Sequence, residues 1–202
     1  MTLRRGDSDA VLAEAPGIVR GRMAIGGQEH FYLEGQIALA IPGEDDEVTV
    51  YTSTQHPSEA QALVAKVLGT VNSAVTVEVR RMGGGFGGKT GVGPEVILAA
   101  IAAERIGRPV KVALPRAQTA YLVHHRSATT QRVRIGASRD GRITAFAHEG
   151  VAAQNDDARF LETIPFGSLP LYAGANRRFR TDLIRLDLPA TRAGRAPGEA
   201  SG

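Results

Sequence analysis

The sequence predicts an α+β fold in which antiparallel and mixed strands form hairpins and a few helices lie between them. Two observations lead to this expectation. Short runs of β-branched or alternating apolar residues recur along the 202 residues, and several of them flank a short polar turn. The two clear helical stretches do not alternate regularly with strands, as they would in a doubly wound parallel sheet.

The first quarter of the chain predicts an arm and then a hairpin. Residues 1–15 are polar and lack apolar periodicity, so we expect a flexible N-terminal arm ahead of one partial domain over residues 16–202. The run from Phe31 to Ile41 is rich in apolar residues and predicts a strand. An acidic turn over residues 44–47 separates it from a second predicted strand, residues 48–53, which completes the hairpin.

Two helices follow, each with recognisable ends. Apolar residues at helical spacing after Ser58, a plausible N-cap, predict a helix that Gly69 terminates. A strand from Ala74 to Met82 then leads into a glycine-rich loop. Pro94 suits the first position of a helix, and the apolar run that it opens ends at Gly107.

The second half of the chain predicts further strands. Residues 109–114 read as a strand, and residues 129–151 read as a long hairpin around an Arg-Asp-Gly-Arg turn at residues 139–142. Residues 154–172 are rich in Gly, Pro, Asn and Asp and predict irregular structure. A last strand is expected over residues 181–188.

Composition excludes several classes of protein. The net charge is only +3, the basic residues form no block, and aromatic residues make up 5%, which argues against nucleic-acid binding. There is no cysteine, so the chain itself holds no disulfide and no iron–sulfur cluster. No apolar run approaches the roughly 20 residues needed to span a bilayer, and no secretory signal is recognisable. We therefore expect a cytoplasmic protein that binds neither nucleic acid nor membrane.

The glycine-rich loop admits three interpretations. Gly83, Gly88, Lys89 and Thr90 satisfy the pattern of a phosphate-binding loop, in which backbone N–H groups and the lysine bind phosphates and the threonine holds magnesium. Such a loop opens directly into its helix, whereas Pro94 delays the helix here. The alternatives are a structural turn without a ligand and a loop that binds a different cofactor.

Three motifs resemble signatures of the molybdenum hydroxylases, the family of xanthine dehydrogenase and aldehyde oxidase, and they occur in the family's order. They are GGQEHFYLE (residues 26–34), RRMGGGFGGK (residues 80–89) and RAPGEASG (residues 195–202). The segment HHRSATTQRVRIGASRDGRITAFAHE (residues 124–149) resembles the family sequence between the second and third motifs. The resemblance implies the fold of the molybdopterin-binding domain and a molybdenum-dependent oxidoreductase that hydroxylates an aldehyde or N-heterocycle.

The resemblance also implies a cofactor and the residues beside it. The cofactor is molybdenum held by molybdopterin, often as its cytosine dinucleotide, and the protein need not bond the metal directly. Gln28 would lie beside the metal ligands, where its amide can donate and accept hydrogen bonds. Phe86 and Gly87 would lie against the cofactor through their backbone, and Gly85 and the other glycines of the loop would leave no Cβ in the way. Arg195 would add backbone contacts and a fixed positive charge.

Two departures from the xanthine-type pattern concern the substrate. Thr90 stands where those enzymes carry a purine-binding glutamate, and Pro197 stands where they carry an aromatic residue that stacks on the substrate. Both departures favour an aldehyde or a broad range of substrates, and they place Thr90 and Pro197 on the substrate side.

The resemblance covers only the front part of the family's catalytic subunit. The family's general-base glutamate has no counterpart here, since Glu199 belongs to the third motif and is not that base. The chain is therefore expected to be an N-terminal-side fragment that is inactive alone. Its expected partners are iron–sulfur and FAD subunits or domains of the same complex. A non-catalytic remnant is the further alternative.

Overall fold

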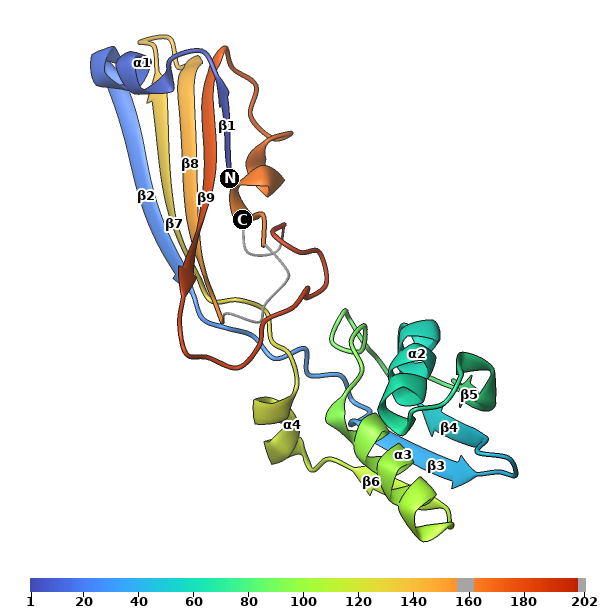
Figure 1. Ribbon diagram of the computed structural model, residues 1–202. Coiled ribbons are helices and arrows are strands. Elements are labelled where there is room, and N and C mark those ends of the chain that lie inside the picture. Colours follow the sequence, from blue (N-terminus) through green and yellow to red (C-terminus); the bar gives the residue numbers. More distant parts are fainter. Residues whose placement is uncertain (156–161, 200–202) are drawn as a thin grey trace. The chain divides into compact units, whose positions relative to one another are not determined.

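The computed structural model describes residues 1–155 and 162–199, which form two compact units. Unit 1 comprises Met1–Gln28 and His125–Gly202, and unit 2 comprises Glu29–His124. Each unit is built around its own β-sheet (Figure 1). The α+β class predicted from the sequence is confirmed, whereas the expected single stretch from residue 16 onward is divided because unit 2 is inserted between the two segments of unit 1. No helix within the described ranges has the length and apolar character needed to cross a membrane.

Unit 1 contains a five-stranded sheet in the order β1-β9-β8-β7-β2. Its strands are β1 (Thr2–Arg5), β2 (Gly17–Ile25), β7 (Thr129–Ala137), β8 (Ile143–Gln154) and β9 (Asn176–Arg185). The β8–β9 pair is parallel and the other pairs are antiparallel. Helix α1 (Ser8–Glu14) buries Leu12 against Ala145 and Ala147 of β8, and the 3-10 helix η2 (Ile164–Ser168) also packs against β8 and β9.

The N-terminal segment is a correction to the sequence analysis, which expected residues 1–15 to be a flexible arm. Strand β1 pairs with β9, with Thr2 opposite Arg180, and Asp7 caps α1 by accepting a hydrogen bond from the backbone N–H of Ala10. The polar sequence of this segment gave no sign of order because the strand that β1 pairs with lies more than 170 residues away along the chain. A four-residue edge strand also needs little apolar periodicity of its own.

Unit 2 contains a four-stranded sheet in the order β5-β4-β3-β6. Its strands are β3 (Ile37–Pro42), β4 (Val48–Thr52), β5 (Val75–Glu78) and β6 (Val110–Ala113), and its helices are α2 (Pro57–Leu68), α3 (Pro94–Ile106) and α4 (Arg116–Leu122), with the 3-10 turn η1 (Asn72–Ala74). Alternate residues of β3 and β4, such as Ala40 and Val50, face one cluster with Val64 of α2 and Ala99 of α3. Helices α2 and α3 therefore cover the same face of this sheet.

Most local features of the sequence prediction are confirmed. The hairpins β3–β4 and β7–β8 form as expected, and both long helices begin with a proline and end at a glycine in the left-handed conformation, Gly69 and Gly107. The N-cap of α2 is His56 rather than Ser58, because the His56 ring accepts a hydrogen bond from the N–H of Glu59. Helix α4 was not expected.

Three strand predictions need correction. The strand expected from Phe31 begins only at Ile37, because Phe31 has a φ of +50° and the chain bends at Leu33 and Glu34. The strand expected over residues 74–82 is confined to β5, and the last strand ends at Arg185. The pairs β4–β5 and β8–β9 are parallel, and β4–α2–β5 is a βαβ unit that the hairpin pattern did not predict.

Candidate functional site

Strained backbone marks all three sequence motifs. Five non-glycine residues of the described chain have positive φ, and three of them, Phe31 (φ +50°), Phe86 (φ +50°) and Ala196 (φ +52°), lie in or beside the three motifs. The other two, Asp45 and Asp46, form the acidic turn of the β3–β4 hairpin. Such conformations cost about 1–3 kcal/mol each and cluster where a site requires them.

The glycine-rich loop of unit 2 is packed too closely for side chains. A Cβ on Gly85 would lie 2.7 Å from Oε1 of Gln55, and Gly87 has a φ of +93°. A side chain at position 85 would therefore displace the Gln55 amide, and the positive φ at position 87 favours glycine. Between these two glycines the Phe86 side chain is 45% exposed, so the loop presents its ring outward on a tightly held backbone.

Gln55, in the turn between β4 and α2, holds this loop in place. Its side-chain oxygen accepts hydrogen bonds from the backbone N–H groups of Gly87 (2.9 Å) and Lys89 (3.3 Å). The backbone N–H of Gln55 donates to the Lys89 carbonyl (2.8 Å). Thr54 Oγ1 also donates to that carbonyl. Sequence reasoning missed Gln55, since an isolated polar residue before a helix carries no spacing signal.

A buried ion pair joins the first motif to the second within unit 2. Lys89 Nζ lies 2.9 Å from Glu34 Oε2 and 2.9 Å from Ser53 Oγ, and its side chain is 1% exposed. Glu34 also accepts hydrogen bonds from Ser53 Oγ (2.5 Å) and the backbone N–H of Gly83 (2.8 Å). Burial tends to raise the pKa of the Glu34 carboxyl, but the hydrogen bonds from Ser53, Lys89 and Gly83 outweigh it and hold the pKa below its ordinary value.

The same contacts bear on the phosphate-binding interpretation. A phosphate-binding loop presents its lysine ammonium to the ligand, whereas the Lys89 ammonium is buried against Glu34. Thr90 Oγ1 donates to the carbonyl of Gly87 (2.7 Å), and α3 begins four residues later, at Pro94. The geometry of the loop therefore does not favour nucleotide binding.

In unit 1, Arg126 connects two of the predicted site residues. The backbones of Gln28 and Arg126 form a two-way bridge, with N···O distances of 3.2 and 2.9 Å, and the Arg126 guanidinium donates to the carbonyl of Arg195. The Arg126 side chain is only 9% exposed. Sequence reasoning did not single out Arg126, although it lies in the segment that resembled the family between the second and third motifs.

The third motif is anchored by a second buried group. Glu162 is fully buried, accepts a hydrogen bond from the backbone N–H of Gly198 (3.1 Å) and lies 3.9 Å from Arg126 Nη1. A Cβ on Gly198, where φ is +78°, would lie 2.7 Å from the carbonyl oxygen of Thr163. Residues 200–202, the end of this motif, lie outside the described residues.

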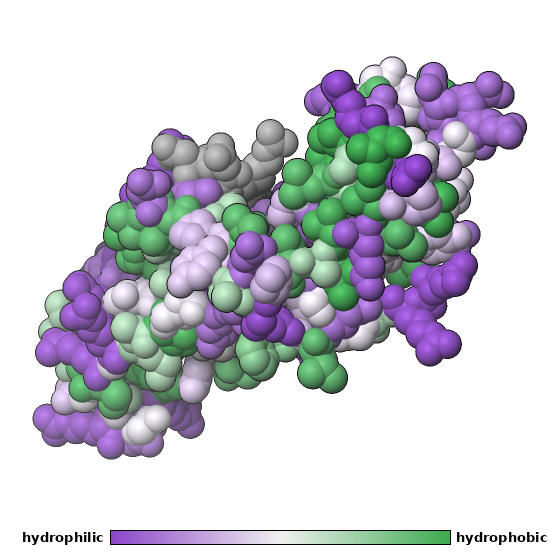
Figure 2. All heavy atoms as spheres, turned by 90° about the horizontal axis from the view of Figure 1, so that it is seen from below, coloured by the Kyte–Doolittle hydropathy of each residue, from purple (hydrophilic) through white to green (hydrophobic). Residues whose placement is uncertain are grey.

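The predicted site residues and the residues that hold them differ in burial. Gln28, Phe86, Arg195 and Pro197 are exposed, and Thr90 is half-buried, whereas Lys89, Arg126 and Glu162 are buried. Figure 2 shows hydrophobic side chains at the surface among hydrophilic ones. In each unit, exposed side chains and strained backbone therefore lie on a rigid buried support, the arrangement that suits binding of a large polar cofactor.

The donor set fits an anionic cofactor. Each unit offers groups that donate hydrogen bonds or positive charge: the Gln28 amide and Arg195 guanidinium in unit 1, and a glycine loop that permits close backbone approach in unit 2. A comparison with protein-family models matches the molybdopterin cofactor-binding domain over residues 1–202. The chain belongs to the molybdopterin cofactor-binding domain family.

Relatives of this molybdopterin cofactor-binding chain are considerably longer. The molybdenum-binding subunit PaoC of an Escherichia coli K12 aldehyde oxidoreductase is 38% identical over 197 residues, which are 98% of this chain and 27% of PaoC. The xanthine dehydrogenase/oxidase of Rattus norvegicus is 34% identical over 206 residues, covering 99% of this chain and 16% of the relative. The chain thus spans about a quarter or less of the length of these relatives.

Solved structures give the same fold. The aldehyde oxidoreductase of Desulfovibrio gigas aligns with a TM-score of 0.82 at 23% identity, covering 98% of this chain and 22% of that one. Quinoline 2-oxidoreductase of Pseudomonas putida 86 aligns with a TM-score of 0.81 at 20% identity, covering 98% of this chain and 26% of that one. The α+β arrangement of this molybdopterin cofactor-binding chain is therefore also found in these two oxidoreductases.

Proposed function

We propose that this chain is part of the catalytic subunit of a molybdenum-dependent oxidoreductase that hydroxylates an aldehyde or an aromatic N-heterocycle. The observation that carries the proposal is the glycine loop of a molybdopterin cofactor-binding domain, held with Phe86 at positive φ by Gln55 and by the buried Glu34–Lys89 pair. The names of the relatives, an aldehyde oxidoreductase and a xanthine dehydrogenase/oxidase, support the class of reaction.

The cofactor that we propose is molybdopterin with molybdenum, in its cytosine dinucleotide form. When bound, this group supplies two-electron redox chemistry and transfer of a water-derived oxygen. In unit 2, Gly85, Phe86 and Gly87 would offer backbone contacts to it. In unit 1, Gln28 would donate a hydrogen bond from its amide, and Arg195 would provide positive charge for the anionic group.

Two residues are proposed for the substrate side. Thr90 holds its hydroxyl against the carbonyl of Gly87, so it presents a small side chain without a charge. Pro197 is exposed in the third motif and is compact. Neither residue supplies the carboxylate or the aromatic face that would recognise a purine, which favours an aldehyde or a range of small substrates.

Turnover would need groups that these 202 residues do not supply. The proposed partners are iron–sulfur and FAD subunits or domains, which would carry electrons away, since the chain has no cysteine to bind a cluster. No general-base glutamate was identified in the chain, and loss of such a base commonly slows a reaction by a factor of roughly 10²–10⁴. We therefore propose that the chain alone is inactive.

The experiment is a purification of the natural protein that contains this sequence, through an N-terminal tag at its own locus. We expect a product with molybdenum near one atom per chain and a pterin dinucleotide released on denaturation. The variants Gln28→Leu and Arg195→Met should each lower the molybdenum content, whereas Arg139→Met, at the β7–β8 turn, should not. A product without molybdenum and pterin would overturn the proposal.

A further inference from the structure

A groove of about 530 Å³ in unit 1 is lined by four arginines. Arg20 and Arg22 come from β2, and Arg132 and Arg134 come from β7. The strand register places Arg20 opposite Arg134 and Arg22 opposite Arg132. Because alternate residues of a strand point to the same face, all four guanidinium groups project from one face of the sheet.

Carboxylates do not balance this charge. Glu149 is the one acidic residue among those that line the groove. It stands opposite Arg132 in the β7–β8 register, lies 3.6 Å from Arg134 and accepts a hydrogen bond from Arg178. Asp9 of α1 reaches Arg134 and Arg178 as well. Within the described residues no ion pair is found for Arg20, Arg22 or Arg132.

Unit 1 as a whole has the same sign of charge. It contains sixteen arginines against eleven acidic residues, whereas unit 2 contains eight basic residues against ten acidic ones. The excess of positive charge in the chain is therefore confined to the unit that carries the groove.

The four arginines repel one another across the β2–β7 pair, and Glu149 alone offsets only part of this repulsion. Like charges directly opposite on neighbouring strands are destabilising. Arginines on β2 alone would protect this edge strand from pairing with other chains, but that purpose does not require matched arginines on β7, an interior strand. A ligand that bridges both pairs would turn the repulsion into binding energy.

We propose that this groove binds a small polyanion with two or more phosphate or carboxylate groups. The planar guanidinium binds both kinds of group through paired hydrogen bonds. The two arginine pairs are two residues apart along the strands, so the anionic groups should be separated by roughly 7 Å. The groove volume lies within the range of about 300–1,000 Å³ common for small-molecule sites.

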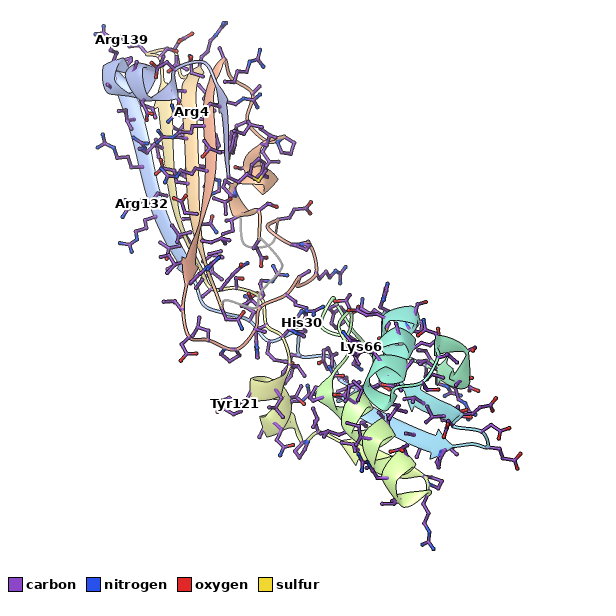
Figure 3. All side chains as sticks on the ribbon, viewed as in Figure 1. Arg4, His30, Lys66, Tyr121, Arg132 and Arg139 are labelled. Carbon is purple, nitrogen blue, oxygen red and sulfur yellow. The ribbon has the colours of Figure 1, made fainter. Side chains whose placement is uncertain are left out.

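The test uses linear tripolyphosphate and isothermal titration calorimetry at about 0.15 M salt, where simple long-range attraction is screened. The groove variant is Arg22→Gln/Arg132→Gln. The matched control is Arg139→Gln/Arg142→Gln, which removes the same charge from the β7–β8 turn; Figure 3 shows Arg139 at the α1 end of the sheet and Arg132 farther along the strands. We expect the unaltered protein (the parent) to bind tripolyphosphate at one saturable site. The dissociation constant should be at least tenfold higher in the groove variant and within twofold of the parent value in the control.

A second measurement separates binding from folding. Without ligand, the groove variant should unfold at the same or a higher temperature than the parent, because a repulsion has been removed. Tripolyphosphate should raise the melting temperature of the parent and of the control, but not that of the groove variant.

Three results would overturn the proposal. The first is absence of saturable binding, and the second is equal weakening in the groove variant and the control, which would mean general charge attraction only. The third is a protein that does not bind tripolyphosphate but binds a peptide with alternating glutamates at one site. That result would assign the groove to an acidic protein segment.

Discussion

The side-chain oxygen of Gln55 accepts a hydrogen bond from the backbone N–H of Gly87 at 2.9 Å. Gly87 follows Phe86, whose φ of +50° is unfavourable for a residue with a side chain. The strained part of the glycine loop is thus fixed by a residue that lies outside all three motifs. Because the same oxygen also binds the N–H of Lys89, one side chain controls two peptide groups of the loop.

This contact predicts a difference between two substitutions at Gln55. Gln55→Leu removes the acceptor and leaves two N–H groups unbonded, at a cost of about 1–3 kcal/mol. Gln55→Glu keeps an acceptor in the same place. Hydrogen exchange followed by mass spectrometry should show exchange of the peptide over residues 83–90 at least tenfold faster in Gln55→Leu and close to the parent in Gln55→Glu. Equal exchange in the two variants would contradict this role.

The Glu34–Lys89 pair predicts an asymmetric double-mutant cycle. Glu34→Leu leaves the buried ammonium of Lys89 without its carboxylate. The loss in free energy of unfolding should therefore approach the roughly 3–5 kcal/mol seen when one partner of a buried pair is removed. Lys89→Met leaves Glu34, whose side chain is 34% exposed, with solvent and two other donors, and should cost about 1–2 kcal/mol. The double variant should lose less than the sum. Urea unfolding at pH 7 measures the free energy of unfolding of the two single variants and the double variant. If the two single losses are equal and add up in the double variant, Glu34 and Lys89 do not stabilise the fold as a pair.

Glu95 predicts a pH-dependent gain in stability on substitution. Glu95 is 1% exposed within α3, and burial raises the pKa of its carboxyl. A hydrogen bond from its own backbone N–H and the charge of Lys89 reduce the size of this pKa shift. A carboxyl with a raised folded-state pKa favours the fold below its ordinary pKa of about 4.5, and this contribution is lost as the pH rises through the folded-state pKa. Glu95→Gln should therefore be more stable than the parent at pH 7.

The measurement for Glu95 is the free energy of unfolding from pH 3.5 to pH 8. The advantage of Glu95→Gln should shrink as the pH falls and vanish below about pH 4.5, where the parent carboxyl is protonated in both states. Glu104→Gln, on the exposed side of the same helix, is the control and should show no such trend. A gain that persists unchanged at pH 3.5 would mean that charge is not its cause.

Arg126 predicts how firmly the third motif is held. Arg126→Met removes the guanidinium that donates to the Arg195 carbonyl, so the loop should open more often. Trypsin cleaves after exposed arginines in mobile chain, and Arg195 is exposed. Cleavage after Arg195 should be at least fivefold faster in Arg126→Met than in the parent, while cleavage after Arg139 stays constant. Unchanged cleavage after Arg195 would show that Arg126 does not restrain the loop.

The burial of Lys89 leads to a prediction for nucleotide binding. With its ammonium against Glu34, the chain should show no magnesium-dependent binding of ATP or GTP in equilibrium dialysis. Saturable binding that Lys89→Ala abolishes would restore the phosphate-binding interpretation. The loss of folded protein in that variant should be checked by circular dichroism, so that unfolding is not read as loss of a site.

Local chemistry made much of the fold predictable. Pro94 and Gly107 delimit α3 because each acts through its own backbone conformation, and the Asp140-Gly141 turn specifies the β7–β8 hairpin in the same way. The glycine loop was predicted as a special segment for a similar reason, since close approach and positive φ leave a compositional mark.

The remaining features depend on residues that are far apart in sequence. Strand β1 is ordered by β9, and the positions of Gln55, Glu34 and Arg126 become significant only when the loops that they bind are present. A single buried glutamate or glutamine has no spacing that distinguishes it from a solvated one. The division of the chain into two units could not be predicted from the sequence either, because the residues around positions 28 and 125 do not have the composition of a linker.

The insertion of unit 2 has a consequence for synthesis on the ribosome. Strand β2 emerges early, but its partner β7 is made only after all 96 residues of unit 2. Unit 2 has its own sheet and core, so it can fold while β2 waits with both edges unpaired. If translation stops after unit 2 and before β7, the product is a folded unit 2 that carries the unpaired nine-residue strand β2. An unpaired strand of this kind tends to pair with other chains and is a target for chaperones and proteases.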